Sequence, residues 1–242
     1  MKNKKKTCLG IILAKSNSRR IKNKNFIKIN NKMMFQFVLD EAIKSNIFFK
    51  IYISTESNKK LKKINQFKKK VFYKSKLDTS YTRSKKLAYD KTPMLKVIKE
   101  IYKKFKVDFP SIKYICMIYA TACLIKKNDF LKAFSRFKKI CKKYRNKGVS
   151  MQTIVSYPAP LEFAIKVKND NQIKYLNKKS LKSTSDNFSK LYYDSGGFHF
   201  LNSNYFHNKK KIYFGYKIPK KRSVDINDLE DLDLAKGLLT KN

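Results

Sequence analysis

The sequence predicts an α/β fold with a mostly parallel sheet, helices on both faces and a small antiparallel β addition in the second half. Three observations predict it. Short apolar runs alternate with amphipathic segments of helical period over the first 150 residues, as in strand–helix–strand units. The run 114–120 is apolar on both faces, which is typical of a central strand in a covered parallel sheet. After residue 150 the apolar segments become short and strand-like.

The elements of the first half follow from their hydrophobic patterns. In chain order we expect a strand at 7–14, a helix at 33–45, a strand at 50–54, a helix at 92–105, a strand at 114–120 and a helix at 128–141. The helix at 92–105 has the clearest signal. Thr92 can cap its first turn, Pro93 suits that turn, and its apolar residues recur at helical spacing.

The second half predicts short strands and one helix. The strands lie at 151–157, 163–168, 173–175, 198–202 and 212–218, and the helix at 227–239. The chain has no internal repeat and no linker rich in Pro, Gly or Ser, so we treat 1–242 as a single domain. In open α/β sheets ligands bind beyond the carboxyl ends of the strands. We therefore expect the site at the loops after Ala14, Ser54 and Ala120.

Charge is the outlying feature of the composition. Lys plus Arg number 58 against 17 for Asp plus Glu, which gives a net charge of +41. Such a charge suggests nucleic acid, because cations on one face neutralise phosphates. Only six of the 58 are Arg, the residue that base recognition favours, and Lys is spread along the whole chain. We interpret the charge as composition bias and do not expect nucleic acid as the partner.

The amino end imitates a signal peptide, with basic residues 1–6 before the apolar run 8–14. That run is short and no small-residue cleavage site follows it, so a buried strand explains it better. No stretch approaches the roughly 18 apolar residues that span a membrane. The four cysteines lack metal-ligand spacing and are interpreted as reduced thiols. We expect a cytoplasmic protein without a membrane partner.

The loop after the first strand carries the strongest functional signal. It offers cations among small hydrogen-bonding residues: Lys15, Arg19, Arg20, Lys22 and Lys24. This combination suits a polyphosphate, because several donors must match its charge at once. The loop contains no glycine, so it is neither a Walker A loop nor a dinucleotide fingerprint.

The same loop resembles the signature Ala-Arg-Gly-Gly-Ser-Lys-x-Ile-x-x-Lys-Asn of the sialic-acid-type cytidylyltransferases, which make CMP-activated nonulosonic acids. The matching positions are Ala14, Ser18, Ile21, Lys24 and Asn25. Lys15 stands where the family has Arg, and Arg19 where it has Lys. Ser16 and Asn17 replace the two glycines, and without them we expect the backbone to approach the nucleotide less closely.

Six further segments resemble motifs of this family and follow in its order. They lie at 51–56, 83–92, 118–122, 157–160, 193–199 and 224–232. Glu56 stands where the family has Asp. The segments 118–122 and 157–160 have the form of the pseudaminic acid branch, although Cys123 replaces that branch's usual Pro. The resemblance spans about residues 8–239 and implies a Rossmann-like fold of the nucleotide-diphospho-sugar transferase type.

The resemblance also implies site residues. Lys15, Arg19 and Lys24 are the candidate catalytic residues, because they would hold the triphosphate. The implied nucleotide-binding residues are Leu13, Ala14, Lys15, Asn17, Ser18, Arg19, Lys24, Asn25, Ser54, Arg83 and Thr121. The implied sugar-binding residues are Tyr157, Asp194, Gly196 and Phe198. No residue is identified as a general base.

The acids cluster near the carboxyl end, where five of the 17 fall within residues 225–233. Hard oxygen ligands beside a phosphate-binding loop suit Mg²⁺. In the family two aspartates, at the positions of Asp225 and Asn227, hold the metal; Asn227 keeps an oxygen ligand but loses a charge. Asp228, Glu230 and Asp231 are interpreted as the start of a helix, where the dipole favours acids.

We therefore expect a Mg²⁺-dependent enzyme that joins CTP to a nine-carbon sugar acid, preferably pseudaminic acid, giving a CMP-sugar and pyrophosphate for the glycosylation of surface structures. Sialic, legionaminic or deoxy-octulosonic acid stay open as the substrate. A non-enzymatic nucleic-acid binder or an inactive homologue is the alternative from another class. The family often forms dimers, so a homodimer is a further expectation.

Overall fold

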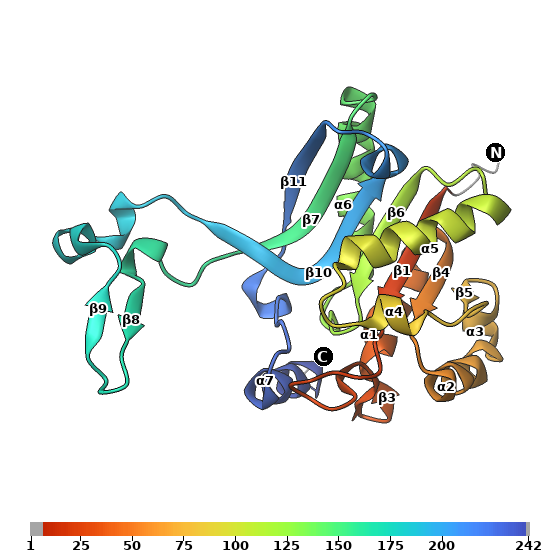
Figure 1. Ribbon diagram of the computed structural model, residues 1–242, viewed down its shortest axis with the longest axis horizontal. Coiled ribbons are helices and arrows are strands. Elements are labelled where there is room, and N and C mark those ends of the chain that lie inside the picture. Colours follow the sequence, from red (N-terminus) through yellow and green to blue (C-terminus); the bar gives the residue numbers. More distant parts are fainter. Residues whose placement is uncertain (1–6, 241–242) are drawn as a thin grey trace.

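The computed structural model describes residues 7–240 and shows a seven-stranded sheet in the order β11-β7-β10-β6-β1-β4-β5 (Figure 1). Its strands are β1 (Cys8–Leu13), β4 (Phe48–Ser54), β5 (Leu77–Asp78), β6 (Tyr114–Tyr119), β7 (Gly148–Ser156), β10 (Tyr192–Asn202) and β11 (Lys211–Lys217). β1 pairs in parallel with β4 and β6, and β10 runs antiparallel to both β6 and β7. The predicted mostly parallel α/β sheet is confirmed.

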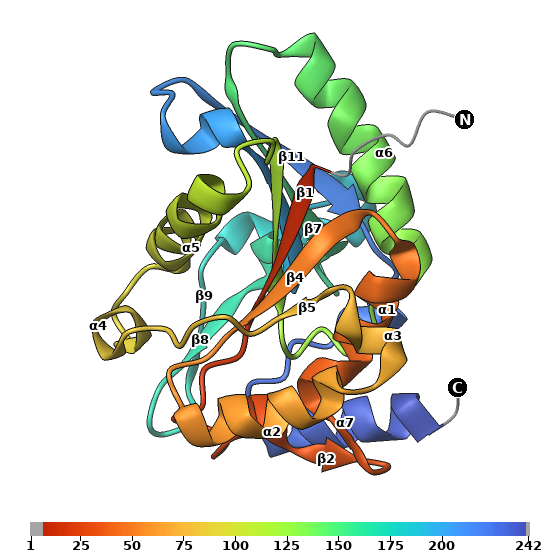
Figure 2. The same ribbon diagram turned by 90° about the vertical axis from the view of Figure 1, so that its right-hand side faces the viewer.

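Helices cover both faces of this sheet (Figure 2). On one face α1 (Met34–Ser45) and α6 (Lys127–Lys143) bury Phe35 and Phe130 against the strands. On the other, α5 (Met94–Asp108) buries its apolar stripe. The stripe forms as predicted, but Thr92 does not cap the helix, which begins at Met94; its hydroxyl instead donates to the Lys86 carbonyl at 3.2 Å.

Shorter elements surround the carboxyl ends of β1, β4 and β6. They are the hairpin β2 (Lys28–Ile29) and β3 (Lys32–Met33), and the helices α2 (Asn58–Lys68), α4 (Lys85–Ala88) and α7 (Leu229–Thr240), whereas the short helix α3 (Val71–Lys74) leads into β5. α7 lies beside the β2–β3 hairpin, where Leu232 and Ala235 pack in one cluster with Ile29 and Met34 (Figures 1 and 2). This packing brings the carboxyl-terminal acids to the same edge of the sheet as the basic loop.

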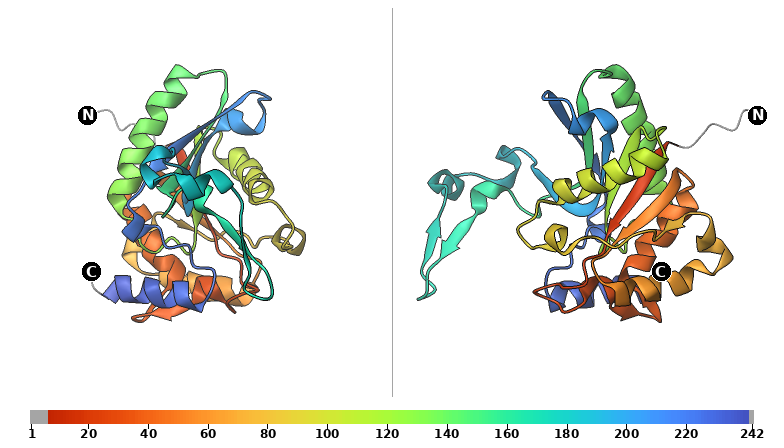
Figure 3. Two further views of the ribbon diagram at one scale, coloured as in Figure 1. Left: turned by 90° about the vertical axis from the view of Figure 1, so that its left-hand side faces the viewer. Right: turned by 45° about the vertical axis from the view of Figure 1, so that its right-hand side comes forward.

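A long arm leaves the sheet between β7 and β10 (Figures 1 and 3). It carries the two-stranded antiparallel sheet of β8 (Ile165–Val167) and β9 (Ile173–Tyr175), in the register Ile165 with Tyr175. Every residue of these two strands is exposed. The predicted antiparallel addition is thus confirmed, and it projects away from the body.

The amino-terminal apolar run is the buried strand β1, as predicted, whereas the basic residues 1–6 lie outside the described part of the chain. Cys8, Cys116, Cys123 and Cys141 are free thiols. Among residues 7–240, none of the helices has both the length and the apolar character needed to cross a membrane.

Candidate active site

The candidate site lies at the carboxyl edge of the parallel strands, where the loops after β1, β4 and β6 meet. The Ala14 amide donates to the Ser54 carbonyl at 2.9 Å and joins the first two of these loops. The Arg83 amide donates to the Thr55 carbonyl at 2.8 Å and adds the segment before α4. This edge carries the predicted nucleotide-binding residues: Leu13, Ala14, Lys15, Asn17, Ser18, Arg19, Lys24, Asn25, Ser54, Arg83 and Thr121.

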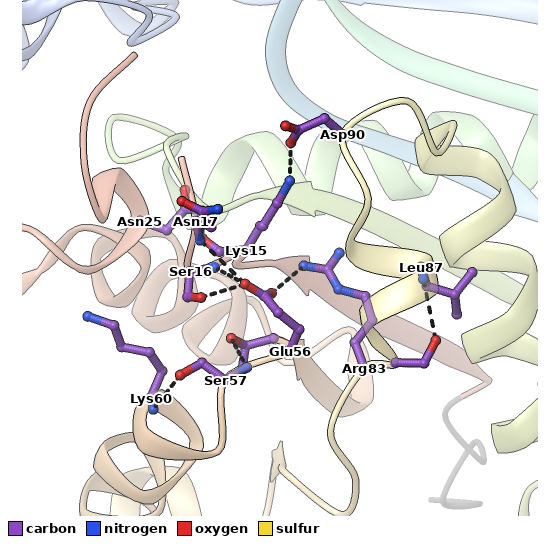
Figure 4. A network of polar contacts seen from close by, with 12 residues as sticks. Lys15, Ser16, Asn17, Asn25, Glu56, Ser57, Lys60, Arg83, Leu87 and Asp90 are labelled. Carbon is purple, nitrogen blue, oxygen red and sulfur yellow. Dashed lines mark hydrogen bonds and ion pairs between the residues drawn. The ribbon is translucent and has the colours of Figure 1, made fainter. Parts of the chain in front are cut away.

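Two cations of the basic loop share one carboxylate. Lys15 and Arg19 both form ion pairs with Asp90, which lies between α4 and α5 (Figure 4 shows the Lys15 contact). The hydrogen bond from Lys15 and the neighbouring positive charges lower the pKa of Asp90. The Arg19 side chain is 72% exposed, so this ion pair is open to solvent and to a competing anion. Asn25 stabilises the loop from within, because its Nδ2 donates to the Lys15 carbonyl at 2.8 Å.

Glu56 accepts hydrogen bonds from the basic loop and was not among the predicted site residues. Its Oε1 accepts hydrogen bonds from the Ser16 amide at 2.9 Å and the Ser16 hydroxyl at 2.5 Å, and its Oε2 pairs with Arg83 Nη2 at 3.2 Å (Figure 4). Burial raises the pKa of Glu56, but the hydrogen bonds from Ser16 and Arg83 outweigh it and lower the pKa overall. Glu56 is therefore an ionised carboxylate between the loop and Arg83.

Lys24 connects the basic loop to the acidic segment. Its ammonium group donates to the carbonyl of Ile226, between the two predicted metal ligands. Burial and then the charge of Arg20 lower the pKa of Lys24, while Asp225 and Asp231 oppose that shift. The contact brings together residues that are 202 positions apart in the sequence.

The acidic segment divides into helix-capping and site-facing residues. Asp231 Oδ2 accepts the Asn227 amide at 2.7 Å and Asp228 Oδ1 accepts the Asp231 amide at 2.9 Å, so both acids cap α7 as predicted. Asp225 instead lies beside Asn227, whose Nδ2 donates to Asp225 Oδ2 at 2.9 Å. Gly196 leaves room for this carboxylate: it has φ +64°, and a Cβ there would lie 3.3 Å from the Asp225 carboxyl group.

The donor set fits Mg²⁺ shared with a substrate better than a closed protein cage. Within residues 7–240 no group of three or more His, Cys, Asp or Glu side chains could hold a metal ion. One carboxylate and one amide oxygen, from Asp225 and Asn227, match the way Mg²⁺ is bound by one or two carboxylates plus substrate phosphates.

A pocket of about 420 Å³ opens beside Asp225. Its lining comes from the β7 and β10 strand ends, the segment 220–227 and α7: Ser156, Pro158, Tyr193, Lys220, Ser223, Val224, Asp225, Asn227, Asp231 and Leu234. Asp194 follows Tyr193 in β10 and forms a 2.9 Å hydrogen bond with His199. Of the predicted sugar-binding residues, Tyr157 packs on Tyr193 with ring centroids 4.8 Å apart, at the base of the arm.

Phe198 is the predicted sugar-binding residue that does not reach the site. It is fully buried and stacks on Phe130 of α6 with ring centroids 4.7 Å apart. Phe198 and Phe200 share one face of β10, whereas His199 points to the other. Phe198 therefore belongs to the core, and we do not include it in the proposed site.

A family model described as Cytidylyltransferase matches residues 9–238. The chain belongs to this cytidylyltransferase family. It is a nucleotidyltransferase enzyme whose matched region includes the basic loop, Arg83 and the acidic segment.

Relatives of this cytidylyltransferase match it in sequence over nearly its whole length. It is 26% and 24% identical to the pseudaminic acid cytidylyltransferases of Campylobacter jejuni strains 81-176 and NCTC 11168, covering 97% of each chain in both cases. It is 25% identical, over 94% of its length, to part of a Helicobacter pylori protein named pseudaminic acid cytidylyltransferase and UDP-2,4-diacetamido-2,4,6-trideoxy-beta-L-altropyranose hydrolase, of which it covers 40%.

Solved structures confirm the fold of the cytidylyltransferase. A CMP:2-keto-3-deoxy-manno-octonic acid synthetase complexed with CTP is similar, with a TM-score of 0.64, 10% identity and coverage of 97% of this chain and 98% of that one. A 4-diphosphocytidyl-2C-methyl-D-erythritol synthase from Anaerococcus prevotii has a TM-score of 0.61 with 12% identity, and the match covers 97% and 99% of the two chains.

Arg222 is a second residue, after Glu56, that supports the site of the cytidylyltransferase and was not identified from the sequence. Arg222 forms a two-bond ion pair with Asp129 at the start of α6 and thereby fastens the segment that carries Asp225. Arg222 is one of only six arginines in a chain rich in lysine, which is a signal that could have singled it out.

Proposed function

We propose that this cytidylyltransferase transfers CMP from CTP to a hydroxyl group of pseudaminic acid and releases pyrophosphate. The observation that carries the proposal is the contact of Lys24 with the Ile226 carbonyl, because it brings the basic loop and the acidic segment to one edge of the sheet. A triphosphate needs the cations of the basic loop, and a divalent cation needs the oxygen ligands of the acidic segment. The choice of sugar acid is supported by the relatives named for pseudaminic acid, which match along 97% of the chain.

The reaction needs positioning and charge neutralisation more than covalent help from the protein. The sugar hydroxyl oxygen bonds to the α-phosphorus while the bond to the β-phosphate oxygen breaks, and the hydroxyl proton is released. Lys15, Arg19 and Lys24, with Asn17 and Ser18, would hold the phosphates. The exposed Asp90 would give up Lys15 and Arg19 to the triphosphate.

The remaining site residues divide between the base, the metal and the sugar acid. Arg83 would place the cytidine with Leu13, Ala14, Ser54 and Thr121, while Asn25 keeps the loop in shape. Asp225 and Asn227 would hold Mg²⁺, which neutralises phosphate charge when bound. The pocket beside Asp225 would take the sugar acid, with Lys220 on its wall to meet the carboxylate.

A pyrophosphate-release assay with CTP, Mg²⁺ and a panel of sugar acids tests the function. We expect the highest kcat/KM with pseudaminic acid, and a preference for sialic, legionaminic or deoxy-octulosonic acid would reassign the substrate. Lys24→Met should lower kcat/KM at least about 100-fold, because it removes both a half-buried cation and the link to the acidic segment. Lys22→Met, which removes an exposed cation from the same loop, is the matched control and should stay within about twofold.

The rival class of function predicts a different result. A nucleic-acid binder or inactive homologue would show salt-dependent DNA binding without stabilisation by CTP. Membership of an enzyme family over residues 9–238 supports the catalytic alternative. A cytoplasmic location is part of the same proposal, since the reaction consumes CTP.

A homodimer built through the arm completes the proposal. The β8–β9 hairpin exposes Ile165, Val167 and Ile173, and a two-stranded hairpin with apolar residues in water needs a partner surface to be stable. Light scattering after gel filtration should give twice the chain mass for the wild type and the chain mass for Val167→Lys. Val107→Lys, at a still more exposed valine near the end of α5, should leave the dimer intact. A wild-type monomer would refute this part.

A further inference from the structure

One carboxylate joins three separate segments of the site. Glu56 follows β4, and its Oε1 accepts the Ser16 amide at 2.9 Å, the Ser16 hydroxyl at 2.5 Å and the Asn17 amide at 3.3 Å. Its Oε2 pairs with Arg83 Nη2 at 3.2 Å (Figure 4). The side chain of Glu56 is 13% exposed and that of Arg83 is 5% exposed, so both groups are largely withdrawn from water.

These contacts give the basic loop its shape without glycine. Within residues 7–240 the non-glycine residues of positive φ are Asn23, Asn30, Asn31, Asn46 and Asn171. Ser16 and Asn17 are thus in backbone regions open to any residue, and the loop does not depend on left-handed conformations. Its two consecutive amides instead converge on one oxygen of Glu56, an arrangement that binds anions well.

The same carboxylate orients Arg83. The Arg83 Nε is buried and has no hydrogen-bond partner among residues 7–240, so the Glu56 bond carries the orientation of the guanidinium group. An arginine that is buried beside one carboxylate and keeps an unused donor is suited to receive a further acceptor from a ligand. Without Glu56 the buried charge of Arg83 would lose its counter-charge and its direction.

Glu56 could instead compete with phosphate for the loop amides, but the arrangement of the cations argues against it. The loop side chains that would bind phosphate, Lys15 and Arg19, are directed to Asp90 and not to Glu56. The loop therefore has an amide side that is held by Glu56 and a cationic side that is open to solvent. Binding a triphosphate on the cationic side leaves the Glu56 contacts in place.

We propose that Glu56 is a positioning residue for the nucleotide, because its carboxylate sets the spacing between the basic loop and Arg83. This inference rests on the proposed function, in which the loop holds the triphosphate and Arg83 places the cytidine. A preorganised loop and guanidinium group raise affinity, since CTP then binds without first ordering them.

The test compares Glu56→Gln with wild type in CTP titration calorimetry and in steady-state kinetics. Glutamine keeps the size and can accept the loop amides, but its NH₂ group opposes Arg83 donor to donor. We expect the Kd and KM for CTP to rise at least about tenfold while the KM for the sugar acid stays within about twofold. Glu56→Asp keeps the charge but withdraws it by about 1.5 Å and should recover part of the affinity.

Controls distinguish a failure of the proposed function from a failure of the positioning role of Glu56. Glu100→Gln, which removes an exposed carboxylate from α5, should leave all constants unchanged. Wild type that neither binds nor turns over CTP would refute the proposed function itself. Wild type that binds CTP, with unchanged or tighter binding in Glu56→Gln, would refute the positioning role alone. If Glu56→Gln does not fold, Ser16→Ala replaces it: about threefold weaker CTP binding supports the role, and unchanged binding overturns it.

Discussion

Arg222 is the cation whose removal should alter the proposed metal-binding residues without replacing either of them. Its Nη1 and Nη2 donate to the two carboxylate oxygens of Asp129 at 2.6 and 2.8 Å, and Asp129 also accepts the Lys126 amide at 2.9 Å. Arg222 lies three residues before Asp225, so this pair attaches the segment to the first turn of α6. Arg222→Met keeps much of the side-chain length and removes the charge and both bonds.

The magnitude follows from how far the pair is buried. Breaking a fully buried pair costs about 3–5 kcal/mol, because the remaining charge is left without a partner. Here the Arg222 side chain is 24% exposed, and Asp129, at 6%, keeps its bond from the Lys126 amide. We therefore expect Arg222→Met to lower the free energy of unfolding by about 2 kcal/mol, or the Tm by roughly 4–8 °C for a chain of this size.

Urea unfolding and thermal melts measure this loss. Arg222→Lys keeps the charge but not the planar fork, so about half of the loss should remain. Lys236→Met is the matched control, since it breaks the ion pair with Asp233, whose side chains are 45% and 71% exposed, and should cost less than about 0.5 kcal/mol. Arg222→Met should also raise the Mg²⁺ concentration for half-maximal activity. The reasoning is refuted if Arg222→Met destabilises the protein no more than Lys236→Met does.

Three further predictions follow from the neighbourhood of this segment. In Mg²⁺ titrations of activity, Asp225→Asn should raise the half-saturating concentration at least about tenfold, and Asn227→Asp should lower it because a ligand charge is added. Gly196→Ala should lower the free energy of unfolding by more than about 1 kcal/mol in urea, since Gly196 has φ +64° and its Cβ would meet Asp225. For Asp194, burial raises the pKa, but the bonds from His199 and the Gly196 amide outweigh it and hold the pKa below its ordinary 3.8. The unfolded chain thus binds this proton more readily, so stability present above the ordinary value is lost as pH falls below it; the melts of Asp194→Asn between pH 6 and 3 should show a weaker pH dependence.

The central elements could be predicted from the sequence because their burial produces local hydrophobic patterns. β1 and β6 are apolar on both faces, and the predicted strands agree with them to within one residue. The helix α2 was missed because its apolar face is narrow: Ile64 is its buried residue, and five of its 11 residues are lysine. Its local signal is the Ser57 cap, whose hydroxyl accepts the Lys60 amide at 3.3 Å.

The site was predictable where its residues are consecutive and not where they meet through space. The basic loop could be identified from one segment, whereas Glu56 contacts residues 40 and 27 positions away and Arg222 contacts a residue 93 positions away. Local patterns carry no information on such pairs. Phe198 is a different case, since the two-residue period shared with Phe200 already indicated the core face of β10.

The pairing of cations with scarce acids is the means by which a chain of charge +41 would form the proposed triphosphate site. Arg83 and Arg222 are paired with the largely buried carboxylates of Glu56 and Asp129, and such pairs are harder to break because the charge that remains would be poorly solvated. Lys15 and Arg19 share the exposed Asp90, and ion pairs in water hold only weakly. In the proposed function, a triphosphate would therefore displace Asp90 readily but would not displace the other two acids. Burial thus separates the cations that keep their protein partners, Arg83 and Arg222, from the cations that the proposed function assigns to the substrate, Lys15 and Arg19.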